Sequence, residues 1–243
     1  MWQQITPFYL NFIDSVKQLS GQCCWVCKQP GANLCSGCLD NINKPAYYCY
    51  RCGQSMVTQT AMQYCRACLS QPPPFEQLYF IGTYHQALAD MVIAAKIARQ
   101  TSALAALQTL VYYEIAINRQ DWQQRYAGYK ILPVPTPKSR LIQRGFNLPR
   151  IIAQLFADEM GLPIIGSHMV TLPWYQPKQA KMNRLQRQKN RHNYQIHHKL
   201  GKKILIIDDI VTTGNTVREL AVKLQQNHVE TVAVWAIARG QSQ

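Results

Sequence analysis

The sequence has 243 residues, of which 47% are apolar and 16% charged, with 26 Lys and Arg against 12 Asp and Glu. This length and apolar content exclude a disordered chain and allow one large or two modest domains with a buried core. No apolar run approaches the roughly 18 residues that cross a bilayer, and the first residues lack the basic start and cleavage site of a secretory signal. We therefore expect a cytoplasmic protein with no membrane span, in a compartment where thiols stay reduced.

The formal net charge of +14 is concentrated in one part of the chain. Residues 130–203 contain 14 basic and two acidic side chains, whereas residues 204–243 contain three basic and four acidic ones. A positive charge this concentrated indicates an anionic partner, such as a nucleic acid or a phosphorylated ligand.

The N-terminal part of the sequence combines a helical pattern with a cysteine-rich segment. Apolar side chains recur at helical spacing between Trp2 and Val16, which predicts an amphipathic helix within residues 1–22. Residues 23–70 contain all nine cysteines, and eight of these form four C-x-x-C pairs: Cys24/Cys27, Cys35/Cys38, Cys49/Cys52 and Cys65/Cys68.

Such pairs are typical of four-cysteine zinc sites, because two C-x-x-C turns place four thiolates around one ion. A segment this small has too little apolar core to fold without an ion. We therefore predict a double zinc ribbon with two structural zinc ions, whose closed thiolate shells leave no position for catalysis. The spacing allows pairing in chain order or a cross-braced pairing. Cys23 is left over as a small packing residue, and Gly53 is expected to have a positive φ in its turn.

The proline-rich residues 71–78 mark a linker, and residues 79–243 form a second predicted domain. Strand and helix patterns alternate in this domain, which predicts an α/β fold with a parallel sheet. The last strand, helix and strand make a βαβ unit with parallel strands. The expected elements are a helical region at about 86–118, a strand at 129–134, a helix at 148–160 closed by Gly161, a strand at 203–207, a helix at 216–226 and a strand at 231–237.

The turn between strand and helix in the βαβ unit carries the most specific pattern of the sequence. Asp208 and Asp209 follow an apolar strand, and Thr212–Thr216 precede the helix. Parallel sheets bind ligands at the carboxyl ends of their strands, and a helix N-terminus attracts anions. The pattern therefore suits a ligand with sugar hydroxyls, a phosphate group and Mg²⁺. An ordinary capped loop would account for the threonines, but not for two adjacent acids.

This segment resembles the phosphoribosyl pyrophosphate (PRPP) signature of type I phosphoribosyltransferases. The order of cysteine pairs, the segment 133–147 and the acidic pair is similar to the ComF/GntX family, the competence protein F family, over residues 24–239. The resemblance implies a type I phosphoribosyltransferase-like domain behind the zinc ribbons. It also implies that PRPP contacts the acidic pair, the following loop and the loop after Val134: Asp208, Asp209, Thr212, Thr213, Gly214, Asn215, Thr216, Pro135, Thr136 and Lys138. Lys96 resembles a lysine of the same group, although we favour the simpler interpretation of a solvated lysine on a helix face.

The stretch 178–203 is basic and contains no acid. A solvated charged surface is the simplest explanation. However, the stretch precedes the PRPP strand, and Trp174, Tyr175 and Tyr194 are available to stack on bases. In type I transferases a basic loop in this part of the chain closes over pyrophosphate, so the stretch could serve PRPP, single-stranded DNA or both. The predicted contacts to DNA or pyrophosphate are Arg144, Lys178, Lys181, Arg184, Arg187 and Arg191.

Two functions follow as expectations. We favour a PRPP-binding, DNA-handling factor of natural transformation, as the resemblance implies, with single-stranded DNA and a competence helicase as candidate partners. The alternative is an active phosphoribosyltransferase, in which an acceptor attacks Mg²⁺-bound PRPP and pyrophosphate leaves. The sequence shows no recognisable acceptor pocket, and we assign no catalytic residue.

Overall fold

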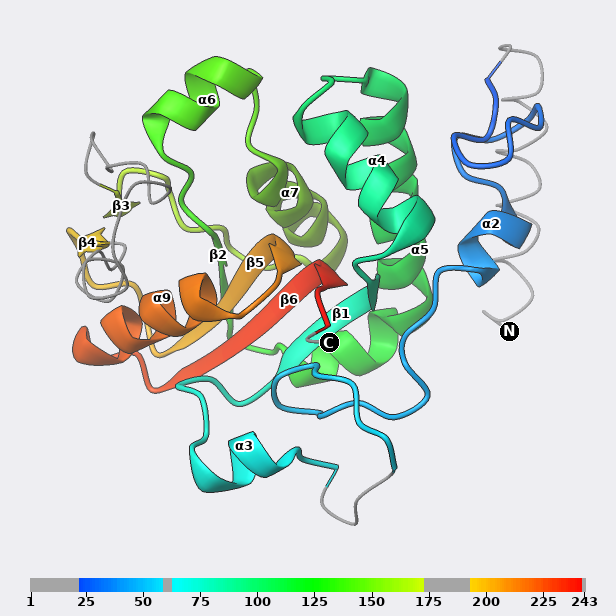
Figure 1. The fold of residues 1–243 in the computed structure, drawn as a ribbon. Helices are drawn as coiled ribbons and strands as arrows, with labels where there is room; N and C mark the ends of the chain where they lie inside the picture. The colour runs from blue at the N-terminus through cyan, green and yellow to red at the C-terminus, as the bar shows by residue number, and fades with distance from the viewer. Residues whose placement is uncertain (1–21, 59–62, 173–192, 242–243) are drawn as a thin grey trace, which may run out of the picture.

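The computed structural model describes residues 22–58, 63–172 and 193–241, and its centre is a four-stranded parallel sheet (Figure 1). The strands are ordered β1-β6-β5-β2, and a two-stranded antiparallel sheet, β3-β4, lies apart from them. The strands are β1 (Leu78–Thr83), β2 (Lys130–Pro133), β3 (Val170–Thr171), β4 (Gln195–Ile196), β5 (Lys203–Val211) and β6 (Thr231–Arg239). The helices are α2 (Ser36–Asp40), α3 (Arg66–Ser70), α4 (Gln86–Lys96), α5 (Thr101–Arg125), α6 (Lys138–Arg144), α7 (Leu148–Met160) and α9 (Asn215–Gln226).

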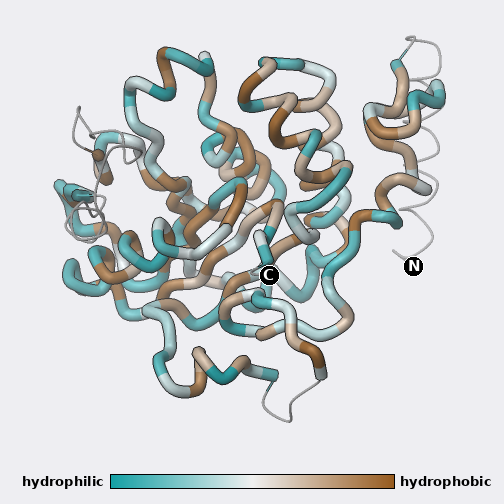
Figure 2. Tube along the Cα trace, in the orientation of Figure 1, coloured by the Kyte–Doolittle hydropathy of each residue, from teal (hydrophilic) through white to brown (hydrophobic). Residues whose placement is uncertain are grey.

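Helices cover both faces of the sheet, which confirms the predicted α/β class. Side chains alternate along β5, so Leu205 and Ile207 pack with α4, α5 and α7, whereas Ile204 and Ile206 pack with α9. Figure 2 shows the apolar residues concentrated in the sheet and in the helices around it, with hydrophilic residues in the loops between them. In the described ranges, no helix is both long and apolar enough to cross a membrane.

The predicted βαβ unit is present, but its strands are longer than the apolar pattern indicated. β5 pairs with β6 in parallel from Lys203 to Val211, so the acidic pair lies inside the strand rather than after it. Helix α7 has the predicted bounds, begins at the cap Asn147 and ends at Gly161, whose φ of +66° is left-handed. The expected helical region at 86–118 is instead two helices, because the chain breaks between Lys96 and Thr101.

The cysteine-rich segment packs against the β1 edge of the sheet and the adjacent helices. Cys24 and Leu34 are buried in the same apolar cluster as α4 and α5. Gly53 has a φ of +72°, as predicted, and a Cβ at this position would lie 3.0 Å from the Phe80 ring. The segment therefore contacts the α/β part of the chain directly. The predicted N-terminal helix at 1–22 lies outside the described residues apart from residue 22.

Candidate functional site

The acidic pair occupies the carboxyl end of β5, next to the middle of the sheet. Asp208 and Asp209 are only 7% and 6% exposed, and each carboxylate accepts a hydrogen bond from the following backbone N–H, at 2.9 and 2.8 Å. Because neighbouring side chains on a strand point to opposite faces, Asp208 faces the α9 layer and Asp209 the α4 layer. Burial and the adjacent Asp209 carboxylate raise the pKa of Asp208 to about 8. An acid with such a pKa in a concave site is a mark of ligand binding or catalysis.

Lys96 forms an ion pair with Asp209, with 2.8 Å between the ammonium nitrogen and a carboxylate oxygen. The two side chains are 18% and 9% exposed. The interpretation of Lys96 as a solvated lysine is therefore wrong. Helical periodicity indicates the face on which a lysine lies, but not that the last turn of α4 meets the end of β5.

The loop after β5 forms a small cradle at the N-terminus of α9. A cavity of about 30 Å³ is lined by Asp208 and residues 210–217, which include the predicted Thr212, Thr213, Asn215 and Thr216. Gly214 is the N-cap of α9 and has a φ of +79°, a backbone conformation that residues other than glycine rarely adopt. The Asn215 N–H lies 3.4 Å from the Thr213 hydroxyl. Backbone N–H groups at the start of a twelve-residue helix suit a phosphate group.

Arg239 supports this cradle from behind, and the sequence analysis missed it. Arg239 is only 5% exposed. Its guanidinium donates hydrogen bonds to the carbonyls of Val211 (3.1 Å), Thr212 and Gly240. Its Nε also donates to the Cys52 carbonyl at 2.8 Å. Arg239 thus links the Cys49/Cys52 pair to the cradle at the start of α9. The only signal in the sequence is a basic residue at the end of an apolar strand.

The loop after β2 lies at the same carboxyl end of the sheet as the acidic pair. The Val134 N–H donates to the Ile207 carbonyl at 2.8 Å, which places the start of this loop beside Asp208. Pro135 and Thr136 are half-buried, and the Thr136 hydroxyl lies 3.1 Å from the Asn147 side-chain oxygen. Lys138 is exposed at the start of α6, and Arg144 is half-buried at its end. The structure thus brings the Pro135 loop and the acidic pair together on neighbouring strands.

Most of the predicted basic contacts fall within residues 173–192, which lie outside the described part of the chain. This range also includes Trp174 and Tyr175. Tyr194 is described and is 3% exposed, packed in the cluster beneath α9. Contrary to expectation, its ring is not available to stack on a base. The residues in the undescribed range are Lys178, Lys181, Arg184, Arg187 and Arg191.

The eight paired cysteines form two clusters in chain order rather than a cross-braced arrangement. In each cluster the four sulfur atoms lie within 4.8 Å of one another, and the Cys27–Cys35 and Cys52–Cys65 sulfurs are 3.7 Å apart. Tetrahedral zinc with bonds of about 2.3 Å separates its sulfur ligands by about 3.8 Å, so the donor sets fit zinc. The first cluster is Cys24, Cys27, Cys35 and Cys38, and the second cluster is Cys49, Cys52, Cys65 and Cys68.

The thiols of the second cluster differ in acidity. A hydrogen bond from Cys52 lowers the pKa of Cys49 to about 4, which favours the thiolate that binds metal. Cys23 is exposed, so its prediction as a packing residue is wrong. Cys23 forms a β-bridge with Pro30, and the next residue, Cys24, is fully buried. Neighbouring side chains of an extended segment point to opposite sides, so Cys23 turns outward.

Comparisons with known proteins found relatives along nearly the whole chain. The DNA utilization protein YhgH of Salmonella typhimurium is 28% identical over 221 residues, which cover 89% of this chain and 96% of the relative. Competence protein F of Haemophilus influenzae is 28% identical over 217 residues, which cover 85% and 90%. YhgH of Escherichia coli K12 is also 28% identical, over 222 residues. No family model matches the sequence.

Proposed function

We propose that this chain handles single-stranded DNA in natural transformation, because it is a homologue of competence protein F and of the DNA utilization protein YhgH. We further propose that it binds PRPP at the acidic pair of β5. The names of the relatives support the DNA role, and the similarity extends over nearly all of both chains. The concentration of basic residues before β5 supports an anionic partner of this kind.

The PRPP proposal rests on one observation: a buried acidic pair lies beside a glycine-capped helix N-terminus at the carboxyl end of a central strand. Carboxylates accept hydrogen bonds from sugar hydroxyls, whereas backbone N–H groups and threonine hydroxyls donate to phosphate oxygens. A sugar phosphate offers both groups at once. In this proposal the ribose hydroxyls contact Asp208 and Asp209, and the 5′-phosphate lies in the Thr212–Thr216 cradle.

The neighbouring loop completes the proposed site. Pro135, Thr136 and Lys138 follow β2 at the same carboxyl end of the sheet, and we assign them to the pyrophosphate end of the ligand. Mg²⁺ bound with PRPP would neutralise part of the pyrophosphate charge. The ion pair with Lys96 holds the Asp209 carboxylate in place. We propose that the PRPP hydroxyl then shares this carboxylate with the lysine.

The alternative function is an active phosphoribosyltransferase. The raised pKa of Asp208 favours it, since groups that titrate near neutral pH are common in active sites. We assign no residue to an acceptor base, whereas the acidic pair and the cradle are both assigned to PRPP. We therefore place ligand binding ahead of catalysis. Release of pyrophosphate from PRPP upon addition of nucleobases would reverse this order.

The PRPP proposal is tested by titrating PRPP with Mg²⁺ into the protein in a calorimeter. We expect saturable binding to the wild type and a loss of at least tenfold in affinity for Asp208→Asn combined with Asp209→Asn. The matched control is Asp158→Asn, which removes an exposed carboxylate on α7. Unchanged affinity in the double variant would remove the site assignment.

A further inference from the structure

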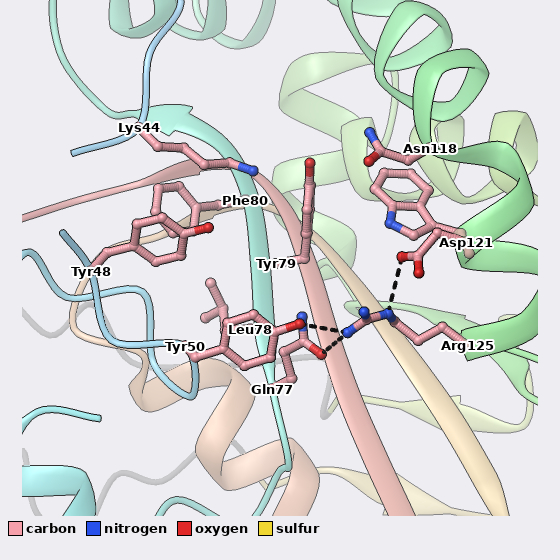
Figure 3. Close-up of a pocket in the computed structure, with 11 residues that line it drawn as sticks. Lys44, Tyr48, Tyr50, Gln77, Leu78, Tyr79, Phe80, Asn118, Asp121 and Arg125 are labelled. Carbon is pink, nitrogen blue, oxygen red and sulfur yellow. Dashed lines mark hydrogen bonds and ion pairs between the residues drawn. The ribbon is translucent and has the colours of Figure 1, made fainter. Parts of the chain in front are cut away.

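A second and larger cavity lies on the β1 side of the sheet, away from the acidic pair. It has a volume of about 140 Å³ and is bounded by side chains from residues 44–50, from the start of β1 and from the last turns of α5 (Figure 3). β6 separates β1 from β5, so this cavity and the candidate PRPP site share no lining residue. Nothing in the proposed PRPP site uses it.

Aromatic rings form the walls of this cavity. The Tyr79 ring packs edge-on against Trp122, with centroids 4.9 Å apart, and the Tyr48 ring packs edge-on against Phe80 at 5.2 Å. The Tyr79 hydroxyl donates to the Glu114 carboxylate. Trp235 stacks on the Tyr79 ring with centroids 6.2 Å apart, and Phe80 and Trp122 are only 1% and 2% exposed. This leaves the rings of the half-buried Tyr48 and Tyr50 as the aromatic surfaces that a ligand can reach. The cavity therefore offers fixed aromatic surfaces, which favour a flat, unsaturated ligand.

A cation lies over these rings with spare hydrogen-bonding capacity. The Lys44 ammonium is 3.9 Å from the Tyr79 ring centroid and 5.7 Å from that of Phe80. Burial lowers the pKa of Lys44. Among the described residues its ammonium has cation–π contacts but no ion pair with a carboxylate. An ammonium has three donors and is costly to bury unless acceptors meet them, so a ligand carbonyl would complete its coordination.

The opposite wall offers an ordered set of polar groups. Arg125 donates to the Tyr50 hydroxyl at 2.7 Å and to the Gln77 side-chain oxygen at 2.8 Å, and pairs with Asp121 at 3.4 Å (Figure 3). These contacts hold the Tyr50 hydroxyl in place and orient the Gln77 amide nitrogen as a donor. The Asn118 amide nitrogen donates to the Glu114 carbonyl, which leaves its own oxygen as an acceptor. Donors and acceptors thus both line one cavity.

We propose that this cavity binds a single nucleobase. A base has the aromatic faces that stack on tyrosine, the carbonyl groups that accept from lysine, and ring or exocyclic N–H groups that donate to an amide oxygen. The volume is of the right order, because a cavity of about 150 Å³ in another protein holds one benzene ring. The cavity therefore has room for one ring system but not for a whole nucleotide.

This inference rests on the proposed function when it assigns the base to single-stranded DNA. In that case one base of the DNA lies in the cavity and its phosphates stay outside. A free nucleoside would present the same chemistry. The two sources are separated by comparing a short thymidine oligonucleotide, the same length of abasic oligonucleotide and free thymidine as probes.

The decisive variant fills the cavity without removing a core side chain. Asn118 is half-buried on α5, and Asn118→Trp would occupy the space of the base. Ile117→Trp is the matched control, because Ile117 is the neighbouring residue, is 54% exposed and does not line the cavity. Lys44→Met is a second test that keeps the packing on Tyr79 but removes the donor. Melting temperatures of all three variants check that the fold is intact.

We expect Asn118→Trp, which excludes the base, to weaken binding of the thymidine oligonucleotide in fluorescence anisotropy by roughly tenfold, since stacking of one base on aromatic side chains supplies an effect of this order. Lys44→Met, which removes the charged donor to the base carbonyl, should weaken it by a similar factor. Ile117→Trp should bind as the wild type does. The wild type should prefer the thymidine oligonucleotide to the abasic one, and PRPP affinity should stay unchanged in every variant.

Equal oligonucleotide affinity in the wild type, Asn118→Trp and Lys44→Met would overturn the nucleobase site and leave the DNA role intact. If Asn118→Trp lowers the melting temperature, Lys44→Met alone decides. A wild type that binds no oligonucleotide would overturn the proposed DNA role instead. In that case calorimetry with free thymidine decides on the cavity: heat that is lost in Asn118→Trp supports the site, and no heat with the wild type rejects it.

Discussion

The ammonium of Lys96 lies 2.8 Å from the carboxylate of Asp209, and this ion pair joins the last turn of α4 to the end of β5. Both side chains are mostly buried, so the pair is weakly screened by water. It fixes one half of the acidic pair before any ligand arrives. The stability of the chain should therefore depend on Lys96.

We predict that Lys96→Met lowers the free energy of unfolding by roughly 2 kcal/mol, because it leaves the Asp209 charge buried without its partner. Adding Asp209→Asn to this variant should recover most of the loss. The control is Lys202→Met, which breaks an exposed ion pair with Glu230 and should change stability by less than about 0.5 kcal/mol. Urea unfolding measures all four proteins. Equal losses in Lys96→Met and Lys202→Met would contradict the role given to the pair.

The raised pKa of Asp208 makes the stability of the protein depend on pH. The pKa is about 8 in the folded chain and 3.8 for an ordinary Asp, so the folded state holds the proton more tightly. The stabilisation from this proton is complete below pH 4 and is lost as the pH rises toward 8. Asp208→Asn removes this titration.

The melting temperature of Asp208→Asn should therefore exceed that of the wild type by an amount that grows between pH 6 and pH 8.5, on the order of 5 °C. Differential scanning calorimetry at both pH values measures it. Asp158→Asn serves again as control and should show no such growth. A constant difference between Asp208→Asn and the wild type would show that Asp208 titrates normally.

The elements of the central unit were predictable because their apolar patterns are unambiguous. The parallel β5-α9-β6 unit, helix α7 with its Gly161 terminus and the turn at Gly53 were expected from sequence and are present. The resemblance to the competence protein F family is confirmed by relatives at 28% identity. Each of these depends on local spacing, which the sequence displays directly.

Contacts between distant segments were not predictable from such spacing. The break at Arg99, where φ is +54°, divides one apolar pattern into two helices without a glycine or proline to mark it. Lys96 and Arg239 acquire their roles only when α4 and β6 meet the end of β5. The cavity of about 140 Å³ likewise forms from three segments that are separated in the sequence, and none of them has a recognisable motif.

The two cysteine clusters predict a zinc content of two ions per chain. Metal analysis of the purified protein should give this ratio, and Cys49→Ser should reduce it to one, because three thiolates hold zinc more weakly than four. Cys23→Ser is the matched control, since Cys23 belongs to neither cluster, and it should retain both ions. A ratio of two in Cys49→Ser would contradict the assignment of the second cluster.

From the contacts of Arg239 we predict that damage to the second cluster weakens PRPP binding at the proposed site. Its guanidinium bridges the Cys52 carbonyl and the carbonyls of Val211 and Thr212, so distortion of the second cluster should loosen the phosphate cradle. We expect Cys49→Ser to weaken PRPP binding several-fold in calorimetry. Cys27→Ser damages the first cluster, which Arg239 does not contact, and should leave PRPP affinity within twofold of the wild type. Equal effects of the two substitutions would remove this coupling.

The most direct test of the central claim is the binding of labelled single-stranded DNA to the wild-type protein by fluorescence anisotropy, between 50 and 200 mM salt and with or without PRPP and Mg²⁺. We predict saturable binding that weakens by at least tenfold over this range, because Lys and Arg contacts release counterions from the phosphates. Binding that does not saturate, or an affinity that is the same at every salt concentration, would contradict the account of this protein as a DNA-handling factor.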